Sequence, residues 1–457
     1  MDNARKQSAA DAYYKKMTET PIPKLIFTLG IPTTISMLIT NIYNMADTYF
    51  VGALGESPQA ATGILFTLQA IIQAIAFMLG QGSGSLVAKA LADKNTDEAS
   101  SYVSSAMLVG TSFGLLLTVF GLLFLNPLLL LLGSTETILP YARDYGMWVL
   151  ISAPIVICSF VLNNNLRYEG KAIYAMVGLV TGGIINIFGD FLLIRVLDMG
   201  VFGAGLATAT SQLISFSILL YFHLKMAQGE IRPRHISRTS AVYLSIFRVG
   251  FPAMLRQGLS SISNGLLNNL TKGYGDAAIA AISVVNRFSM FLMCVGLGIG
   301  QGLQPVASYN YQAKKYKRVK KALLFTMTVG AIFIGCVSLP CAIFAPSVIK
   351  LFQKSPEVIE IGAFALRFAA VGVIFLALSV PVNMLYQSIR KAAISSFLSL
   401  LRSGLLMIPT LLITTSIGGL IGIQISQPIA DVLTGLISIP FIIHFIVKTP
   451  NEDIENQ

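Results

Sequence analysis

The sequence predicts an all-α membrane protein of twelve transmembrane helices in two pseudo-symmetric six-helix bundles. Three observations predict this fold class. Of the 457 residues, 54% are hydrophobic and only 12% are Asp, Glu, Lys or Arg, whereas roughly 25% of a soluble domain is charged. Apolar runs long enough to cross a bilayer recur along the whole chain. The second half of the chain repeats motifs of the first.

Twelve apolar segments are long enough to cross the hydrocarbon core of a bilayer. They are expected near residues 24–51, 61–88, 101–125, 145–166, 173–194, 201–223, 251–272, 278–308, 322–345, 363–388, 394–416 and 421–447. With the N-terminus inside, 23 of the 32 Lys and Arg residues fall in cytoplasmic tails and loops and about 5 in outer loops. Because basic loops stay in the cytoplasm, we expect a multi-pass protein of the cell membrane with both termini cytoplasmic.

The expected organisation has two lobes of six spans each. A cytoplasmic tail (1–23) precedes an N-lobe (24–223), a cytoplasmic linker (224–250), a C-lobe (251–447) and a second tail (448–457). Twelve helices of about 20 residues leave no room for a catalytic or nucleotide-binding domain. The net charge of +11 is best explained by topology, so no nucleic-acid partner is expected. The polar start of the chain argues against a cleaved signal peptide.

An internal repeat defines the relation between the lobes. Gly30-Ile31-Pro32 and Gly80-Gln81-Gly82 in the first half reappear as Gly250-Phe251-Pro252 and Gly300-Gln301-Gly302 in the second, and the offset along the chain is the same for both pairs. Since each copy has an even number of spans, both copies have the same orientation. An axis along the membrane normal should relate them, with a cavity between the lobes, as in many secondary transporters.

Acidic residues inside the spans need an explanation, because a charge at mid-membrane costs about 2.5–3.5 kcal/mol on insertion scales. Asp47 ends a polar stripe on one face of the first span that also includes Thr33, Ser36, Thr40 and Asn44. This face should line a polar interior.

The fifth and sixth spans carry polar residues at the same depth as Asp47. Asn186 lies one turn before Asp190 on the same helix face, and Thr208 lies near the outer end of the next span. We expect these side chains to meet in the outer third of the membrane. Their carboxylate, amide and hydroxyl groups suit either proton transfer or sodium coordination. The structural alternative for Asp47 and Asp190 is a capping or interhelical hydrogen bond.

The C-lobe has no acid at the position that corresponds to Asp47. Its seventh span carries an uncharged stripe that includes Gln257, Asn264 and Asn268. Arg287 lies deep in the eighth span. We therefore assign to the substrate cavity the residues Thr40, Asn44, Gln257, Asn264, Asn268 and Arg287.

The other charged residues inside spans have simpler interpretations. Arg256, Arg367 and Arg402 are expected to reach toward an interface or a lipid phosphate. Asp431 is isolated in the sequence and is better explained by an interhelical hydrogen bond than by a site. The cysteines and histidines form no metal-binding or catalytic constellation, so neither an enzyme nor a metal or other cofactor is expected.

These residues resemble the multidrug and toxic compound extrusion (MATE) transporters, particularly prokaryotic members of the DinF-like branch. The resemblance covers nearly the whole chain. It depends on Gly30-Ile31-Pro32 followed by NIYNMADTYFVGALG, on Asn186 with Asp190, and on the small-residue run from Gly203 to Thr208.

The resemblance implies a V-shaped MATE fold and export of organic, often cationic compounds by antiport with H⁺ or Na⁺. Asp47, Asn186, Asp190 and Thr208 match the family's cation site in the N-lobe, and Pro32 matches a proline at which the first helix bends. The acidic pair that some branches carry in the C-lobe is absent from this sequence. The expected partners are small-molecule substrates and membrane lipids, and we expect a monomer.

Two other transporter classes remain as alternatives. A flippase for lipids or lipid-linked precursors would use a similar large cavity, although such flippases often have more than twelve spans. The major facilitator class also has two parallel six-helix halves, but its Asp-Arg-Gly-Arg loop is absent after the second span.

Overall fold

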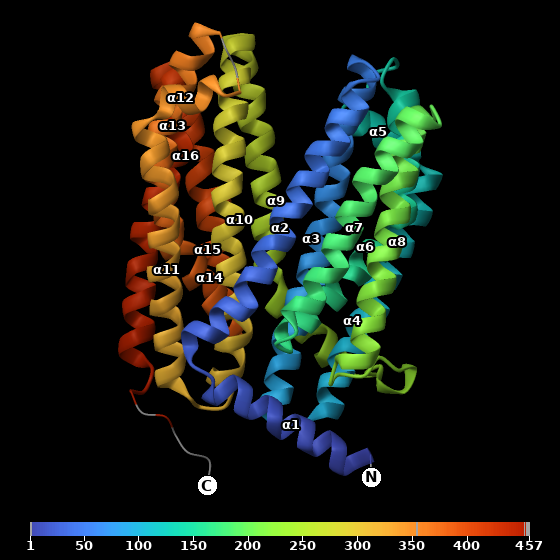
Figure 1. The fold of residues 1–457 in the computed structure, drawn as a ribbon, viewed down its shortest axis with the longest axis vertical. Helices are drawn as coiled ribbons and strands as arrows, with labels where there is room; N and C mark the ends of the chain where they lie inside the picture. Colours follow the sequence, from blue (N-terminus) through green and yellow to red (C-terminus); the bar gives the residue numbers. More distant parts are fainter. Residues whose placement is uncertain (1, 353–354, 452, 454–457) are drawn as a thin grey trace. The chain divides into compact units, whose positions relative to one another are not determined.

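The computed structural model describes residues 2–352, 355–451 and 453, and this part of the chain contains helices and no strand (Figure 1). The α-helices are α1 (Asp2–Glu19), α2 (Ile22–Gly52), α3 (Glu56–Ala92), α4 (Thr96–Leu123), α5 (Leu125–Leu131), α6 (Leu139–Tyr168), α7 (Ala172–Asp190), α8 (Gly200–Met226), α9 (Ser240–Thr271), α10 (Asp276–Gln312), α11 (Tyr316–Ile343), α12 (Ala345–Lys350), α13 (Pro356–Gly372), α14 (Leu376–Ser388), α15 (Ala392–Leu400) and α16 (Met407–Lys448). Two π-helical segments, η1 (Phe191–Val196) and η5 (Leu401–Leu406), and three short 3₁₀ segments, η2 (Pro233–His235), η3 (Lys272–Tyr274) and η4 (Val373–Phe375), join them.

Ten segments of the described chain are long and apolar enough to cross a membrane. They cover eleven of the twelve predicted spans, because the segment Ala392–Lys448 contains the last two. Gly419 has a φ of 55° inside α16, where the chain turns between these two spans. The remaining span lies in α9, which has 32 residues but is rich in polar side chains. The predicted all-helical membrane architecture is confirmed.

The surface of the helices is apolar where a soluble protein would be polar. On α4, large apolar side chains are half or more exposed at Leu115, Leu116, Val119, Phe120 and Leu123. A contiguous apolar surface of this kind marks contact with lipid. The chain is therefore a multi-pass membrane protein.

The chain folds into two compact units. Unit 1 contains α1 up to Lys16 together with Ile35–Gln257, and unit 2 contains Met17–Thr34 together with the chain from Gly258 onward. The boundaries fall inside α1, α2 and α9. The first part of α2 therefore belongs to unit 2 and the first part of α9 to unit 1. The expected division instead places 24–34 in the N-lobe, 240–250 in the linker and 251–257 in the C-lobe.

Close packing at glycines explains this exchange of half-helices. In unit 2, a Cβ atom on Gly302 of α10 would lie 2.7 Å from the Cα atom of Gly30 on α2. In unit 1, a Cβ atom on Gly82 of α3 would lie 3.2 Å from the Cα atom of Gly250 on α9. Only small residues let helix backbones approach so closely. Each Gly-x-Pro motif thus packs against the Gly-Gln-Gly motif of the other copy of the repeat.

The repeat is also visible in the backbone of the two units. Lys94 and Lys314, which are equivalent positions of the repeat, both have a positive φ, of 57° and 56°. Gly170 and Arg390 are equivalent in the same way and have φ values of 71° and 64°. Left-handed conformations are uncommon for residues other than glycine. Their recurrence at equivalent turns supports the duplication.

The N-terminal segment, expected to be a tail, forms helix α1 and contacts unit 1. The hydroxyl of Tyr13 donates a 2.9 Å hydrogen bond to the carbonyl oxygen of Tyr168 at the end of α6. The Lys94 ammonium forms a 2.7 Å ion pair with Asp11. Both contacts hold α1 against the loop ends of unit 1.

The segment between α8 and α9 is held against α4 by serine side chains. The hydroxyl oxygens of Ser100, Ser104 and Ser105 accept hydrogen bonds from the backbone N–H groups of Glu230, Arg232 and Ser237, respectively. The backbone groups of a non-helical segment need such partners. The linker is therefore an ordered part of unit 1.

Candidate functional site

Asp47 lies near the end of α2 in unit 1 and is only 5% exposed. The hydroxyl of Tyr145, on α6, donates a 2.9 Å hydrogen bond to its Oδ2 atom. The other carboxylate oxygen, Oδ1, is buried and accepts no hydrogen bond from the described residues. One oxygen of Asp47 is thus held by the protein, and the other remains available to a ligand.

Hydrogen bonds connect Asp47 to the fifth and sixth predicted spans. The Asn186 side-chain amide, on α7, donates to Thr208 Oγ1, on α8, over 3.2 Å. The Tyr145 hydroxyl lies 3.4 Å from the same Thr208 oxygen. The structure therefore brings Asp47, Asn186 and Thr208 together around Tyr145.

Asp190 lies one turn after Asn186 on α7 and is fully buried. Neither of its carboxylate oxygens accepts a hydrogen bond from a described residue. It lies near enough to Asp47 for the two carboxylates to interact electrostatically. The chain becomes π-helical directly after Asp190, at η1, and π-helical turns often occur at functional sites.

Small residues on α7 let it approach α2 and α8 closely enough to form this cluster. A Cβ atom on Gly183 would lie 3.0 Å from Ile39 and 3.1 Å from Tyr43, both on α2. A Cβ atom on Gly182 would lie 2.7 Å from the Cβ atom of Ser215 on α8. Both glycines precede Asn186 by about one turn. They position the polar end of α7 between its two neighbours.

The cluster presents four buried acceptor oxygens without a donor among the described residues. They are Oδ1 of Asp47, Oδ1 of Asn186 and both carboxylate oxygens of Asp190. Leaving a buried acceptor unsatisfied costs about 1–3 kcal/mol, and more when the group is charged. Oxygen ligands of this kind suit a proton or a small hard cation such as Na⁺. The residues therefore fit a proton or a monovalent cation.

The residues assigned to the substrate cavity lie in both units. In unit 1, Thr40 and Asn44 are half-buried on α2, and Thr40 donates to the carbonyl oxygen of Ser36. Gln257 also belongs to unit 1, where its amide lies 3.4 Å from Oε1 of Gln73 on α3.

In unit 2, Asn264, Asn268 and Arg287 are all exposed. An exposed guanidinium on a membrane-spanning helix needs an aqueous or headgroup environment. Pro32 is buried in the part of α2 that belongs to unit 2. The contacts of these residues with a substrate, and the role of Pro32 in bending, stay predictions.

Two of the arginines inside spans have protein partners. Arg402 donates from Nε to Oδ1 of Asp431 over 3.0 Å, and both side chains are largely buried in unit 2. Arg256 donates to Oε1 of Gln81 in unit 1. The interpretation of Arg402 as an interfacial residue is therefore wrong, because Asp431 compensates its charge, and Asp431 has the interhelical partner expected of it.

Tyr145 belongs to this cluster but is not among the residues predicted from the sequence. It is the first residue of the predicted fourth span and lies toward the same outer side of the membrane as Asp47 and Thr208. The position of Tyr145 along its span therefore indicates that it could lie near Asp47. Tyrosines at span ends are so common as interface anchors that the signal is weak by itself.

Comparison with known proteins gives consistent results. The model of the MatE family matches residues 32–192 and 252–413. The multidrug export protein MepA of Staphylococcus haemolyticus is 27% identical over 429 residues, which cover 93% of this chain and 94% of that protein. A protein of Shewanella oneidensis named FAD transporter is 26% identical over 432 residues, which cover 92% and 94%.

Solved structures show the same fold. A crystal structure of MATE in complex with MaL6 superposes with a TM-score of 0.89 at 25% identity, and the match covers 95% of this chain and 98% of that one. The two matched stretches of the family model correspond to the two copies of the internal repeat and together span more than half of the chain. The chain belongs to the MatE family of transporters.

Proposed function

We propose that this protein exports organic, often cationic compounds across the cell membrane by antiport with H⁺ or Na⁺. It acts as a monomer with both termini in the cytoplasm, uses no cofactor and leaves its substrate chemically unchanged. Its membership in the MatE family and its similarity to proteins named multidrug export protein support this proposal.

One observation supports the coupling above all others. The oxygens of Asp47, Asn186 and Asp190 that lack a donor among the described residues gather in one buried cluster of unit 1. Two carboxylates buried near each other are costly without a cation or a proton between them. Binding of the coupling ion removes this cost, so the ion stabilises one arrangement of the surrounding helices over another.

Coupling requires that ion and substrate bind the alternating conformations with different free energies. Asp47 and Asp190 lie on different helices, α2 and α7. An ion that contacts both carboxylates favours the arrangement in which these helices are close together. Release of the ion leaves the two charges to repel each other and favours separation.

A flavin dinucleotide is a second candidate substrate. A relative of similar identity bears the name FAD transporter. In unit 2, the exposed polar residues Asn264 and Asn268 are uncharged, and Arg287 is an exposed cation. A guanidinium is suited to the phosphate groups of such a compound.

Everted membrane vesicles test the proposal. A fluorescent cationic dye is offered outside the vesicles, and a proton gradient or a sodium gradient is imposed separately. We expect dye uptake with one of the two gradients and its loss in Asp47→Asn. Asp144→Asn, which makes the same change at an exposed position of α6, should retain uptake.

Each outcome has a definite meaning. Uptake in Asp47→Asn at the wild-type rate would contradict coupling through the cluster. If well-expressed protein gives no dye uptake with either gradient, the cationic-drug proposal fails, and uptake of FAD in the same vesicles then tests the second candidate.

A further inference from the structure

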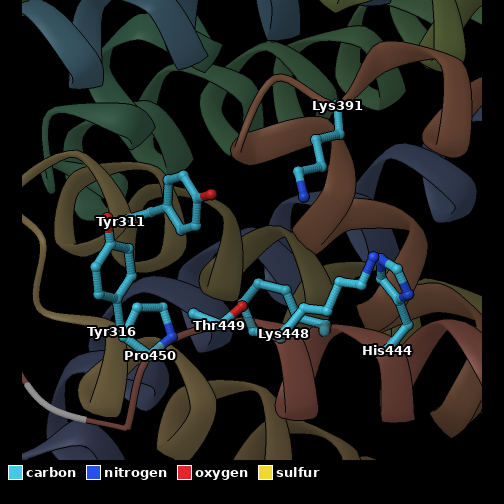
Figure 2. Close-up of a pocket in the computed structure, with 8 residues that line it drawn as sticks. Tyr311, Tyr316, Lys391, His444, Lys448, Thr449 and Pro450 are labelled. Carbon is cyan, nitrogen blue, oxygen red and sulfur yellow. The ribbon is translucent and has the colours of Figure 1, made fainter.

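A small polar pocket lies at the end of unit 2 where α16 ends. Its cavity volume is about 90 Å³, and its lining includes Tyr311, Tyr316, Lys391, His444, Lys448 and Thr449. Figure 2 shows Lys391 reaching from its loop toward the residues of α16, with the two tyrosine rings on the other side. Three loop or helix ends, at α10–α11, α14–α15 and the end of α16, form the pocket.

The pocket is positively charged. The ammonium groups of Lys391 and Lys448 make no hydrogen bond or ion pair with any described residue. Within the described part of the chain, no acidic side chain lines the cavity. Two cations, an imidazole and two phenol side chains thus line one small space, which is the chemistry that recognises a phosphate group.

The internal repeat shows how unusual the uncompensated charge on Lys391 is. Its equivalent in unit 1 is Lys171, which forms a 2.8 Å ion pair with the buried carboxylate of Glu169 and also donates to the carbonyl oxygen of Met226. In unit 2 the residue equivalent to Glu169 is Ile389, which is buried and apolar. In unit 1 the carboxylate of Glu169 therefore compensates the charge of Lys171, whereas no acidic residue in the described part of unit 2 compensates the charge of Lys391.

In unit 1 the linker also covers Glu169, the partner of Lys171. Both oxygens of Glu169 accept hydrogen bonds from the linker, from the backbone N–H groups of Gln228 at 2.7 Å and Gly229 at 3.1 Å. In unit 2 the equivalents of Gln228 and Gly229 are Lys448 and Thr449, which line the cavity together with Lys391. An anion bound there would replace the carboxylate that the second copy of the repeat lacks.

The adjacent face of α16 indicates where the anion comes from. Ile439, Ile443 and Val447 follow one another at intervals of four residues and are all exposed, with Val447 74% exposed. This stripe runs beside His444 and Lys448 and ends at the pocket. An apolar helix face that leads to a basic pocket at the membrane surface matches a phospholipid, with its acyl chains along the stripe and its phosphate in the pocket.

We propose that this pocket binds a phosphate group, and that the group belongs to an anionic phospholipid. The site lies entirely within unit 2 and contains none of the residues assigned to ion coupling or to the substrate cavity. Its occupancy is therefore independent of the proposed export function. The bound lipid supplies to Lys391 the negative charge that Glu169 supplies to Lys171.

Native mass spectrometry of the purified full-length protein in detergent tests the proposal. Phosphatidylglycerol is added to the wild type, to Lys391→Gln/Lys448→Gln, and to Lys317→Gln/Lys321→Gln. The last variant removes the same charge from exposed positions of α11 in the same unit. We expect the wild type and the control to retain bound phosphatidylglycerol, and the pocket variant to bind it about tenfold more weakly. Phosphatidylcholine, with the same phosphate but no net charge, should bind weakly to all three.

A second arm distinguishes the two sources of phosphate. Inorganic phosphate is added in the absence of lipid, and protection of Lys391 against chemical acetylation is measured. Protection at millimolar phosphate without specific retention of phosphatidylglycerol would support an anion site but overturn the lipid source. Equal lipid retention by the pocket and control variants, together with no protection by phosphate, would overturn the proposal entirely.

Discussion

The hydroxyl of Tyr145 holds one oxygen of Asp47 at 2.9 Å, while the other oxygen of the same carboxylate has no donor among the described residues. The single hydrogen bond fixes the orientation of the carboxylate. It also stabilises the ionised carboxylate over the protonated one, because a hydrogen bond to an ionised group is stronger than one to a neutral group. Tyr145 is thus placed to weaken proton binding at Asp47 and so to favour release of the proton.

Replacing Tyr145 by phenylalanine should therefore tighten proton binding at Asp47 and slow proton-coupled turnover. Losing a hydrogen bond to a charged group is worth about 1.5–3 kcal/mol, or roughly ten- to hundredfold in affinity. We expect the proton concentration for half-maximal dye uptake in vesicles to fall by about tenfold or more. Tyr141→Phe, at an exposed position of the same helix, should behave as the wild type. An unchanged ion dependence in Tyr145→Phe would contradict this role.

Thr208 should act through its hydroxyl group. It accepts from the Asn186 amide and lies 3.4 Å from the Tyr145 hydroxyl. Thr208→Val keeps the shape but leaves the buried amide donor without its acceptor, so we expect export to fall by about tenfold. Thr208→Ser should restore most of the activity. Dye uptake by the two variants at equal expression tests this role of the hydroxyl group. Equal rates of uptake in Thr208→Val and Thr208→Ser would rule it out.

The Arg402–Asp431 ion pair should stabilise unit 2 without taking part in transport. Removing one partner leaves an uncompensated buried charge and costs about 3–5 kcal/mol, whereas replacing both with apolar residues is often neutral. Asp431→Asn should thus lower the Tm of the purified protein markedly, and Arg402→Met/Asp431→Leu should recover most of the loss. Thermal unfolding in detergent measures both. A double variant no more stable than the single one would show that the charges are needed for another reason.

Gly302 should tolerate no side chain. A Cβ atom there would lie 2.7 Å from the backbone of Gly30, so α2 and α10 must move apart. Overpacking of this kind costs about 1–3 kcal/mol. Gly335 on α11 has nothing within 4 Å of the position of a Cβ atom, and alanine there should be neutral or stabilising by up to about 1 kcal/mol. The difference in Tm between Gly302→Ala and Gly335→Ala measures the effect of close packing at Gly302. Equal Tm values for the two variants would contradict this close packing.

Much of the fold could be predicted because it depends on local patterns. Apolar runs define the helices, and the internal repeat predicts equivalent contacts. Asn163 and Asn383 illustrate this, since each donates from its side chain to the backbone carbonyl oxygen twelve residues further on, at Ala175 and Ser395. The meeting of Asp47, Asn186 and Thr208 followed from their equal depth in the membrane.

Other features depend on pairings that depth and period do not define. Arg402 and Asp431 are 29 residues apart, on two segments joined through the turn at Gly419, and nothing in their spacing shows that they face each other. The assignment of the first parts of α2 and α9 to units 2 and 1 depends on where glycines permit close approach. A glycine in a sequence does not indicate which helix it faces.

The exchange of half-helices sets an order for the completion of the protein during its synthesis. Unit 1 includes residues up to Gln257, so it cannot close when the sixth predicted span leaves the ribosome. It must wait for the first turns of α9. The segment Met17–Thr34 is made near the start of synthesis, yet its packing surface on α10, around Gly302, is made only after the whole of unit 1. Neither lobe can therefore complete its folding alone during synthesis. A chain that stops anywhere before α10 leaves the segment Met17–Thr34 without its packing partner and exposed to quality control.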